Sequence, residues 1–174
     1  MTQKAKRMIV FGIAICALIA VAFIFSAGVI GVSADNIESD ARKSQKVDAW
    51  EVSKSVNDKI GAMIFYNDTL DAHVFSIYLN REGFSFGYFF RTGGSDSIIM
   101  DGVHEFAYDT HGSAIISMNK VGVAKMKLDN GVDVTQIDID PLKPFAVVIP
   151  ENCGLVTLFD INENTVPITP TRND

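Results

Sequence analysis

The longest hydrophobic stretch lies near the N-terminus, where residues 8–32 contain no charged side chain. A helix rises about 1.5 Å per residue, so a helix of this length would exceed the ~30 Å hydrocarbon core of a bilayer. Lys4, Lys6 and Arg7 precede the stretch, and such cations collect on cytoplasmic flanks. We therefore predict a single-pass signal anchor at 8–32 with the lipid bilayer as its partner, a cytoplasmic basic N-terminus at 1–7, and an extracytoplasmic remainder.

Two alternatives exist for the same segment. A cleaved signal peptide would use the small residues at 32–34, but the apolar regions of such peptides usually span only about 7–15 residues. A lipoprotein acylated at Cys16 fits less well, because the preceding residue is the large Ile15. Small residues recur at Gly12, Cys16 and Ala20, a spacing that lets two membrane helices approach closely. Weak helix–helix self-association is therefore a second predicted interaction.

From residue 60 onward the pattern changes to short runs of β-branched and aromatic residues separated by Gly, Asn, Asp and Pro. Such runs predict β-strands, and their separators predict turns. The strongest turn signal is Asp129-Asn130-Gly131, because Asn and Gly accept a positive φ. The predicted strands are 60–66, 72–80, 84–91, 103–108, 113–118, 121–128, 132–139, 145–149 and 155–161.

Alternation within two runs indicates where each strand lies in its sheet. In 84–90 every second residue is aromatic, which is typical of a central strand. In 132–140, Ile137 and Ile139 alternate with aspartates, which is typical of an edge strand. The fold class expected is mainly β, with one antiparallel β-sandwich or rolled β-sheet domain of about eight to nine strands at 59–174.

The polar segment 33–58 connects the two predicted parts. Its apolar residues are too sparse for a strong hydrophobic stripe, so we expect a juxtamembrane stalk or a short helix. Trp50 is the only tryptophan, and we expect it to pack this segment onto the core of the β domain. A ligand-stacking role is the alternative for Trp50.

Charge and cysteine content exclude some functions. The chain has a net charge of −6, and the basic N-terminus makes the remainder more acidic still, so binding to nucleic acid is not expected. Cys16 lies in the predicted anchor and Cys153 lies far along the β domain, so no intrachain disulfide is expected. An exported domain of this size without disulfides favours a bacterial envelope.

Two partial catalytic motifs fail their structural requirements. Residues 83–87 match G-x-S-x-G, but Ser85 lies inside a predicted strand instead of between a strand and a helix. His104 and Glu105 begin an H-E-x-x-H zinc motif, but Tyr108 stands where the second histidine is required. The sequence therefore predicts no catalytic residue.

The remaining histidines and aspartates have simpler interpretations. His73 begins a predicted strand and is expected to be exposed or capping, and His111 precedes a glycine in a predicted turn. Asp133, Asp138 and Asp140 lack the spacing of a calcium loop, so surface charge is the favoured interpretation. We predict no metal site and no cofactor.

Aromatic residues are the best candidates for recognition. Tyr78, Tyr88 and Arg91 form the predicted ligand-binding neighbourhood, where stacking and an arginine could bind a glycan or an envelope protein. Packing in the core is the competing interpretation.

The leading functional hypothesis is a membrane-anchored, extracytoplasmic β-domain protein that acts as a binding or envelope-complex accessory module. The alternative is a membrane-anchored or secreted hydrolase with an unrecognised site. For that alternative, the residues to test are Ser85, His104 and His111.

Overall fold

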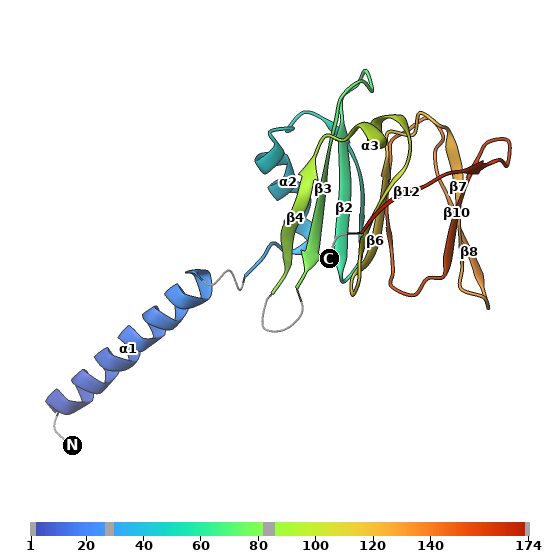
Figure 1. Ribbon diagram of the computed structural model, residues 1–174. Coiled ribbons are helices and arrows are strands. Elements are labelled where there is room, and N and C mark those ends of the chain that lie inside the picture. Colours follow the sequence, from blue (N-terminus) through green and yellow to red (C-terminus); the bar gives the residue numbers. More distant parts are fainter. Residues whose placement is uncertain (1–2, 27–29, 82–85, 173–174) are drawn as a thin grey trace.

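The computed structural model describes residues 3–26, 30–81 and 86–172 (Figure 1). Its helices are α1 (Gln3–Ser26), the 3₁₀ turn η1 (Ala34–Asn36), α2 (Ile37–Gln45) and α3 (Ser97–Asp101). Its strands are β1 (Glu51–Val56), β2 (Ile60–Tyr66), β3 (His73–Asn80), β4 (Tyr88–Gly94), β5 (His104–Tyr108), β6 (Gly112–Ser117), β7 (Val123–Asp129), β8 (Val134–Asp138), β9 (Phe145–Ile149), β10 (Leu155–Asp160), β11 (Thr165–Val166) and β12 (Thr169–Arg172).

The predicted transmembrane helix at 8–32 is wrong. In the described part of the chain, no helix has both the length and the apolar character needed to cross a membrane. The hydrophobic stretch is divided between two kinds of structure: α1 ends at Ser26, whereas Ile30 and Val32 form β-bridges to the start of the β4 region. An apolar composition suits a helix and a strand alike, so it did not show where one ends and the other begins.

The described side chains of α1, residues 11–22, are exposed. Self-association through Gly12, Cys16 and Ala20 stays a prediction, as do the domain boundaries and the extracytoplasmic location of the β domain.

Twelve strands form three sheets of four strands each. The first sheet has the order β1-β2-β3-β4, the middle sheet β12-β5-β6-β9 and the outer sheet β11-β10-β7-β8. Neighbouring strands pair antiparallel except β12 and β5, which are parallel. The mainly β class agrees with the prediction, but the single antiparallel sandwich of eight to nine strands is replaced by three sheets.

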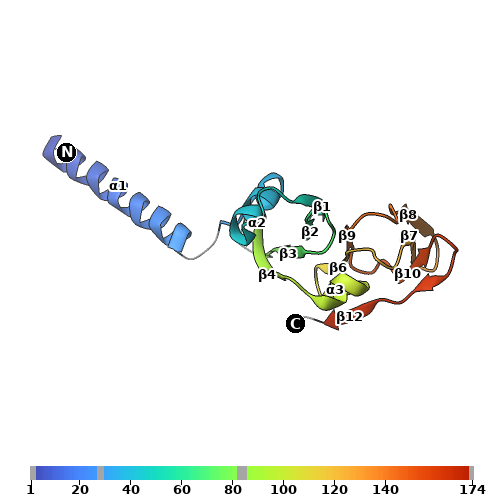
Figure 2. The same ribbon diagram turned by 90° about the horizontal axis from the view of Figure 1, so that it is seen from above.

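The layers follow one another across the molecule in the order α2, first sheet, middle sheet and outer sheet (Figure 2). Strand β6 shows how the middle sheet is buried on both faces, because neighbouring side chains of a strand point in opposite directions. Ile116 packs toward the first sheet and Ile115 toward the outer sheet. Each of these two side chains is fully buried.

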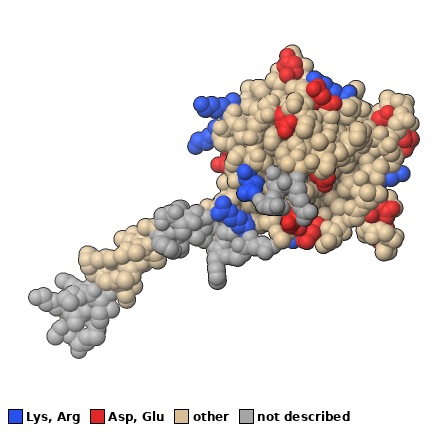
Figure 3. Space-filling model, viewed as in Figure 1, with Lys and Arg blue, Asp and Glu red and all other residues tan. Residues whose placement is uncertain are grey.

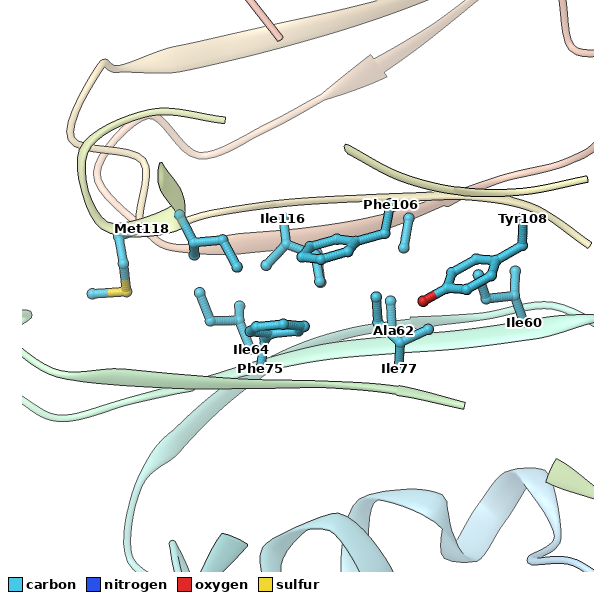
Figure 4. Close-up of a cluster of buried hydrophobic side chains, with 12 residues drawn as sticks. Ile60, Ala62, Ile64, Phe75, Ile77, Phe106, Tyr108, Ile116 and Met118 are labelled. Carbon is cyan, nitrogen blue, oxygen red and sulfur yellow. The ribbon is translucent and has the colours of Figure 1, made fainter. Parts of the chain in front are cut away.

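Three hydrophobic cores separate the layers. The first core lies between the first and middle sheets and contains Ile60, Ala62, Ile64, Phe75, Ile77, Ile99, Phe106, Tyr108, Ala114, Ile116, Met118 and Ala146. Figure 4 shows these side chains meeting from the two sheets, with Phe75 and Phe106 stacked at 4.8 Å between ring centroids. The second core lies between the middle and outer sheets and contains Val103, Ile115, Val123, Met126, Phe145, Ile149 and Leu158.

The helix-side core lies between α2 and the other face of the first sheet. It contains Ile37, Ala41, Val47, Met63, Phe65, Tyr78 and Tyr88, with Trp50 packed against it. Arg42 fixes the chain after α2, because its Nη1 donates to the carbonyl oxygens of Val47 at 3.2 Å and Trp50 at 2.7 Å. Trp50 therefore packs against the core, as expected for the segment that precedes the β domain.

Strand β1 was not predicted, because its sequence is polar and it lies within 33–58. Its polar residues have a structural role: the hydroxyl oxygens of Ser53 and Ser55 accept from the backbone N–H groups of Ala146 at 3.3 Å and Val148 at 3.2 Å. These hydrogen bonds join the edge of the first sheet to the edge of the middle sheet.

The two predictions of strand position had different outcomes. The aromatic run at 84–90 does not form a central strand, because β4 lies at an edge of the first sheet, and residues 82–85 lie outside the described residues. Strand β8 is an edge strand of the outer sheet, as its alternation predicts. Its Ile137 is half-buried against the second core.

Candidate functional site

A buried polar cluster lies where β3, α3, β5 and β12 meet; we call it the histidine cluster. It contains His73, Asp96, His104 and Thr171. The Nε2 atom of His104 lies 2.6 Å from the hydroxyl oxygen of Thr171, and its Nδ1 lies 3.4 Å from a carboxylate oxygen of Asp96. The backbone N–H of Asp96 donates to Nε2 of His73 at 3.2 Å.

Burial disfavours the charged form of both imidazoles in the histidine cluster. His73 is 2 % exposed and His104 is 3 % exposed, and this burial lowers the pKa of each ring below its ordinary value. The nearby charge of Asp96 opposes the pKa shift of both rings. The Nδ1 atoms of both rings are buried without a hydrogen-bond partner, so the contact of His104 with Asp96 is an ion-pair distance without hydrogen-bond geometry.

The order hydroxyl, imidazole, carboxylate is the order found in nucleophilic triads. A triad also needs access for the substrate, and here the base is almost completely buried. The same contacts hold the C-terminal strand β12 against β5 and α3. No local pattern in the sequence indicates this cluster, because His104 and Thr171 are separated by 67 positions.

The three residues of the predicted ligand-binding neighbourhood lie on two neighbouring strands of the first sheet, β3 and β4, but their surroundings differ. Tyr78 and Tyr88 belong to the helix-side core; the Tyr78 hydroxyl donates to Asp40 at 2.7 Å, and burial followed by this hydrogen bond raises the pKa of Tyr78. The Tyr88 hydroxyl donates to the carbonyl oxygen of Asn57. Arg91 is exposed on β4 and exerts its charge on Tyr108 in the first core. The structure therefore brings Tyr78 and Tyr88 together in the helix-side core, whereas Arg91 is exposed outside that core. Ligand binding by these residues stays a prediction.

The other predicted residues are dispersed. Ser85 lies outside the described residues. His111 is a turn residue whose Nε2 lies 3.0 Å from the carbonyl oxygen of Asn80. His73 is buried, contrary to the prediction, because α3 covers the start of β3 through Asp96. Cys16 and Cys153 are both free.

The described residues contain no group of three or more His, Cys, Asp or Glu side chains that could hold a metal ion.

The outward face of the outer sheet is a second candidate site. Register places Leu155 opposite Asp129 and Asp129 opposite Val134, so these three side chains are neighbours on one face. Leu155 is 69 % exposed and Val134 is 60 % exposed. Val132, in the adjoining hairpin turn, is 89 % exposed. Apolar side chains in this arrangement are available to a partner.

Edge strands expose backbone hydrogen-bonding groups unless something covers or interrupts them. In the described structure, β1 and β9 cover each other, β11 has only two residues, and β12 contains Pro170, which lacks an N–H. Strand β4 forms a β-bridge with Val32. Its pairing with β3 is interrupted by a bulge, where the register shifts between Ile77 and Tyr78 of β3. None of these features occurs in the described pairing of β8.

The pairing of β8 with β7 shows which backbone groups face away from the sheet. The N–H of Ile139 donates to the carbonyl oxygen of Ala124 at 2.9 Å. Because hydrogen-bonded residues alternate along an antiparallel pair, Thr135 and Ile137 also point their backbone groups toward β7. The backbone N–H and C=O groups of Val134, Gln136 and Asp138 therefore point out of the free edge.

This edge is acidic. Residues 129–140 include Asp129, Asp133, Asp138 and Asp140 and no Lys or Arg. On the face shown in Figure 3, acidic groups are more frequent than basic ones toward the end of the molecule where β7, β8 and β10 lie.

The lysines of the adjacent strand β7 have partners of their own. Lys125 is paired with Glu163, and Nζ of Lys127 lies 5.0 Å from the centroid of the Phe159 ring. The four aspartates of 129–140 outnumber these two lysines, so the edge of β8 has a negative character.

Comparison with protein-family models, with curated proteins and with solved structures gives no significant match to this chain.

Proposed function

We propose that the β domain is an interaction module and that its docking surface is the outer sheet, comprising the free edge of β8 and the adjoining outward face. The observation that carries this proposal is that β8 is open along its backbone edge and on its outward face. All of its residues except Ile137 are exposed. Protein partners bind unpaired strand edges and exposed apolar side chains.

The distribution of polar and apolar groups supports the same proposal. Val134 and Leu155 flank Asp129, so apolar contact and charge alternate over a short distance. Protein interfaces likewise combine apolar contact with hydrogen-bonding polar groups. The binding class agrees with the leading hypothesis from the sequence, although the surface differs from the aromatic neighbourhood predicted there.

Site-specific photo-crosslinking in the native host tests this proposal. A photoreactive residue replaces Gln136 on β8 or Thr157 on β10, and Asp71 in the exposed β2–β3 turn is the control position. We expect a discrete adduct from the two outer-sheet positions and none from the control. The crosslinked protein must then bind the purified full-length chain. Equal labelling at all three positions, or no rebinding, would contradict the proposal.

Hydrolysis at Thr171 is a second candidate, favoured by the 2.6 Å contact between its hydroxyl and His104. The burial of His104 makes this the weaker candidate. An activated ester serves as the probe substrate. Loss of turnover in both Thr171→Val and His104→Gln, with unchanged circular dichroism, would favour hydrolysis. Equal turnover in the wild type and both variants would exclude it.

A further inference from the structure

We propose that the free edge of β8 binds an extended, positively charged peptide segment, which adds to the outer sheet as a further strand. This inference rests on the proposed function and names both the binding mode and the partner class. Three separate features of the edge carry it: the direction of its backbone groups, the alternation of its side chains and its charge.

The backbone supplies the first feature. Val134, Gln136 and Asp138 each direct one N–H and one C=O away from β7, as the Ile139-to-Ala124 hydrogen bond requires. Alternate residues of a strand are about 6.8 Å apart, which is also the repeat of the backbone groups on an incoming strand. An extended segment of about five residues can therefore pair along the whole of β8.

The side chains define the sequence pattern of the partner. Val134, Gln136 and Asp138 lie on the outward face, where the Gln136 amide donates to the Asp138 carboxylate at 2.8 Å. Ile137 lies on the opposite face and is half-buried against the second core. A paired strand places its own alternate residues beside these two rows. Residues beside Asp138 should be Lys or Arg, and residues beside Ile137 should be β-branched or otherwise apolar.

Charge selects among possible partners. A second copy of the same edge would bring two acidic 129–140 segments together, and like charges gathered at one pairing edge are unfavourable. A cationic strand would instead form an opposite-charge pair with Asp138, on the outward face. Lys125 and Lys127 lie opposite Asp138 and Gln136 on β7 and reduce this preference, but the four aspartates of 129–140 outnumber them. The acidic residues thus disfavour self-pairing and favour a basic segment.

The test measures binding of a labelled synthetic peptide to the full-length chain by fluorescence anisotropy. The probe is a peptide of about seven residues in which Lys and Val alternate, and the matched control has Glu in place of Lys. We expect the Lys peptide to bind at least ~10-fold more tightly at low salt and to lose affinity as salt is added. Equal affinity for the two peptides would overturn the proposal.

Two variants separate backbone pairing from charge. Gln136→Pro removes an outward N–H and leaves the hydrogen bonds to β7 intact, because proline is tolerated at the free edge of a strand. We expect it to weaken binding of the Lys peptide ~10-fold or more, while its control Gln136→Thr keeps the N–H and binds like the wild type. Asp138→Asn should weaken binding ~3-fold and reduce its dependence on salt.

Thermal denaturation must first show that each variant remains folded. If Gln136→Pro were destabilised, a Lys peptide with alternate backbone amides N-methylated would be used instead. N-methylation removes the peptide's own N–H donors to β8, so we expect the same ~10-fold or greater loss of affinity. If crosslinking identifies a partner at the outer sheet but the variants and the peptide pair have no effect, the docking surface stands and strand addition is wrong. If crosslinking also fails, both proposals are wrong.

Discussion

Asn119 adopts a left-handed backbone conformation, with φ of 59°, in the loop between β6 and β7. Its side-chain amide donates to the carbonyl oxygens of Val123 at 3.0 Å and Asp140 at 2.9 Å, and its side-chain oxygen accepts from the N–H of Val123 at 2.7 Å. The side chain is 4 % exposed, so no solvent replaces these bonds if they are lost. One residue therefore fixes the entry to the outer sheet.

We expect Asn119→Ala to lower the free energy of unfolding by about 2–4 kcal/mol, measured by urea denaturation. The loss combines unsatisfied buried backbone groups with the cost of a left-handed alanine. Asn119→Gly is the matched control, because it removes the same hydrogen bonds but accepts the positive φ. A smaller loss for Gly than for Ala measures the backbone strain. Equal losses would show that strain makes no contribution.

The two buried histidines should make stability fall in mild acid. Burial lowers the pKa of His73 and His104 below the ordinary 6.5, so the unfolded chain binds protons at a pH where the folded chain does not. Their contribution is fully present above pH 6.5 and is lost as the pH falls from 6.5 toward the folded pKa values. Carboxylates with lowered pKa values, such as Glu38, act at lower pH because their ordinary pKa is 4.5.

We therefore expect the urea midpoint to fall between about pH 7 and pH 5. The double variant His73→Gln, His104→Gln should be less stable at neutral pH, because it disturbs buried contacts. Its midpoint should nevertheless change less over the same pH interval. An unchanged slope in the double variant would assign the acid sensitivity to other groups.

Sequence alternation identified side-chain direction only where both faces of a strand had contrasting residues. In β8, the alternation of isoleucines with aspartates correctly indicated which face packs inward. His73 was predicted to be exposed, because nothing in its neighbours along the chain indicates that α3 will cover it. Its burial depends on Asp96, which is 23 positions away. Such contacts are invisible to periodicity.

At the scale of elements, β12 depends on one parallel pairing with β5 and on the contact between Thr171 and His104. Thr171→Val keeps the shape of the side chain but removes the hydroxyl, which leaves Nε2 of His104 without its partner. We expect a loss of about 1–3 kcal/mol in thermal denaturation and faster digestion by carboxypeptidase. Thr169→Val in the same strand is the control and should behave like the wild type, because Thr169 is exposed. Equal effects would contradict the role of the hydroxyl.

Elements with strong local signals were predicted, and elements defined by distant contacts were not. β2 and β9 have the predicted bounds because their β-branched runs are interrupted at both ends. β1 was missed because its polar serines accept hydrogen bonds from backbone N–H groups of β9, more than 90 positions away in the chain. The N-terminal apolar run was misassigned because Ile30 and Val32 pair with residues of the β4 region that are distant in the sequence, and no local pattern indicates this pairing.

At the scale of the molecule, the middle sheet links all the other layers. A sandwich or rolled sheet was expected from the number of strands and their short links, and these do not show how the strands divide into sheets. Strand β6 is buried on both faces and so lies in a middle sheet. The sequence shows that such a strand is buried, but strand order determines which sheet covers each face. Three four-stranded sheets therefore could not be distinguished from two larger ones by pattern alone.

Because β6 belongs to both the first and second cores, we expect the layers to unfold together. Ile115→Ala and Ile116→Ala truncate neighbouring, fully buried side chains that enter different cores, and each should cost about 2–5 kcal/mol. Trp50 reports on the helix-side core, two sheets away from the cavity created by Ile115→Ala. In urea, the midpoints from Trp50 fluorescence and far-ultraviolet circular dichroism should coincide and should fall together in both variants. An Ile115→Ala variant in which the dichroism midpoint falls while the Trp50 midpoint stays unchanged would show that the outer sheet unfolds as a separate unit.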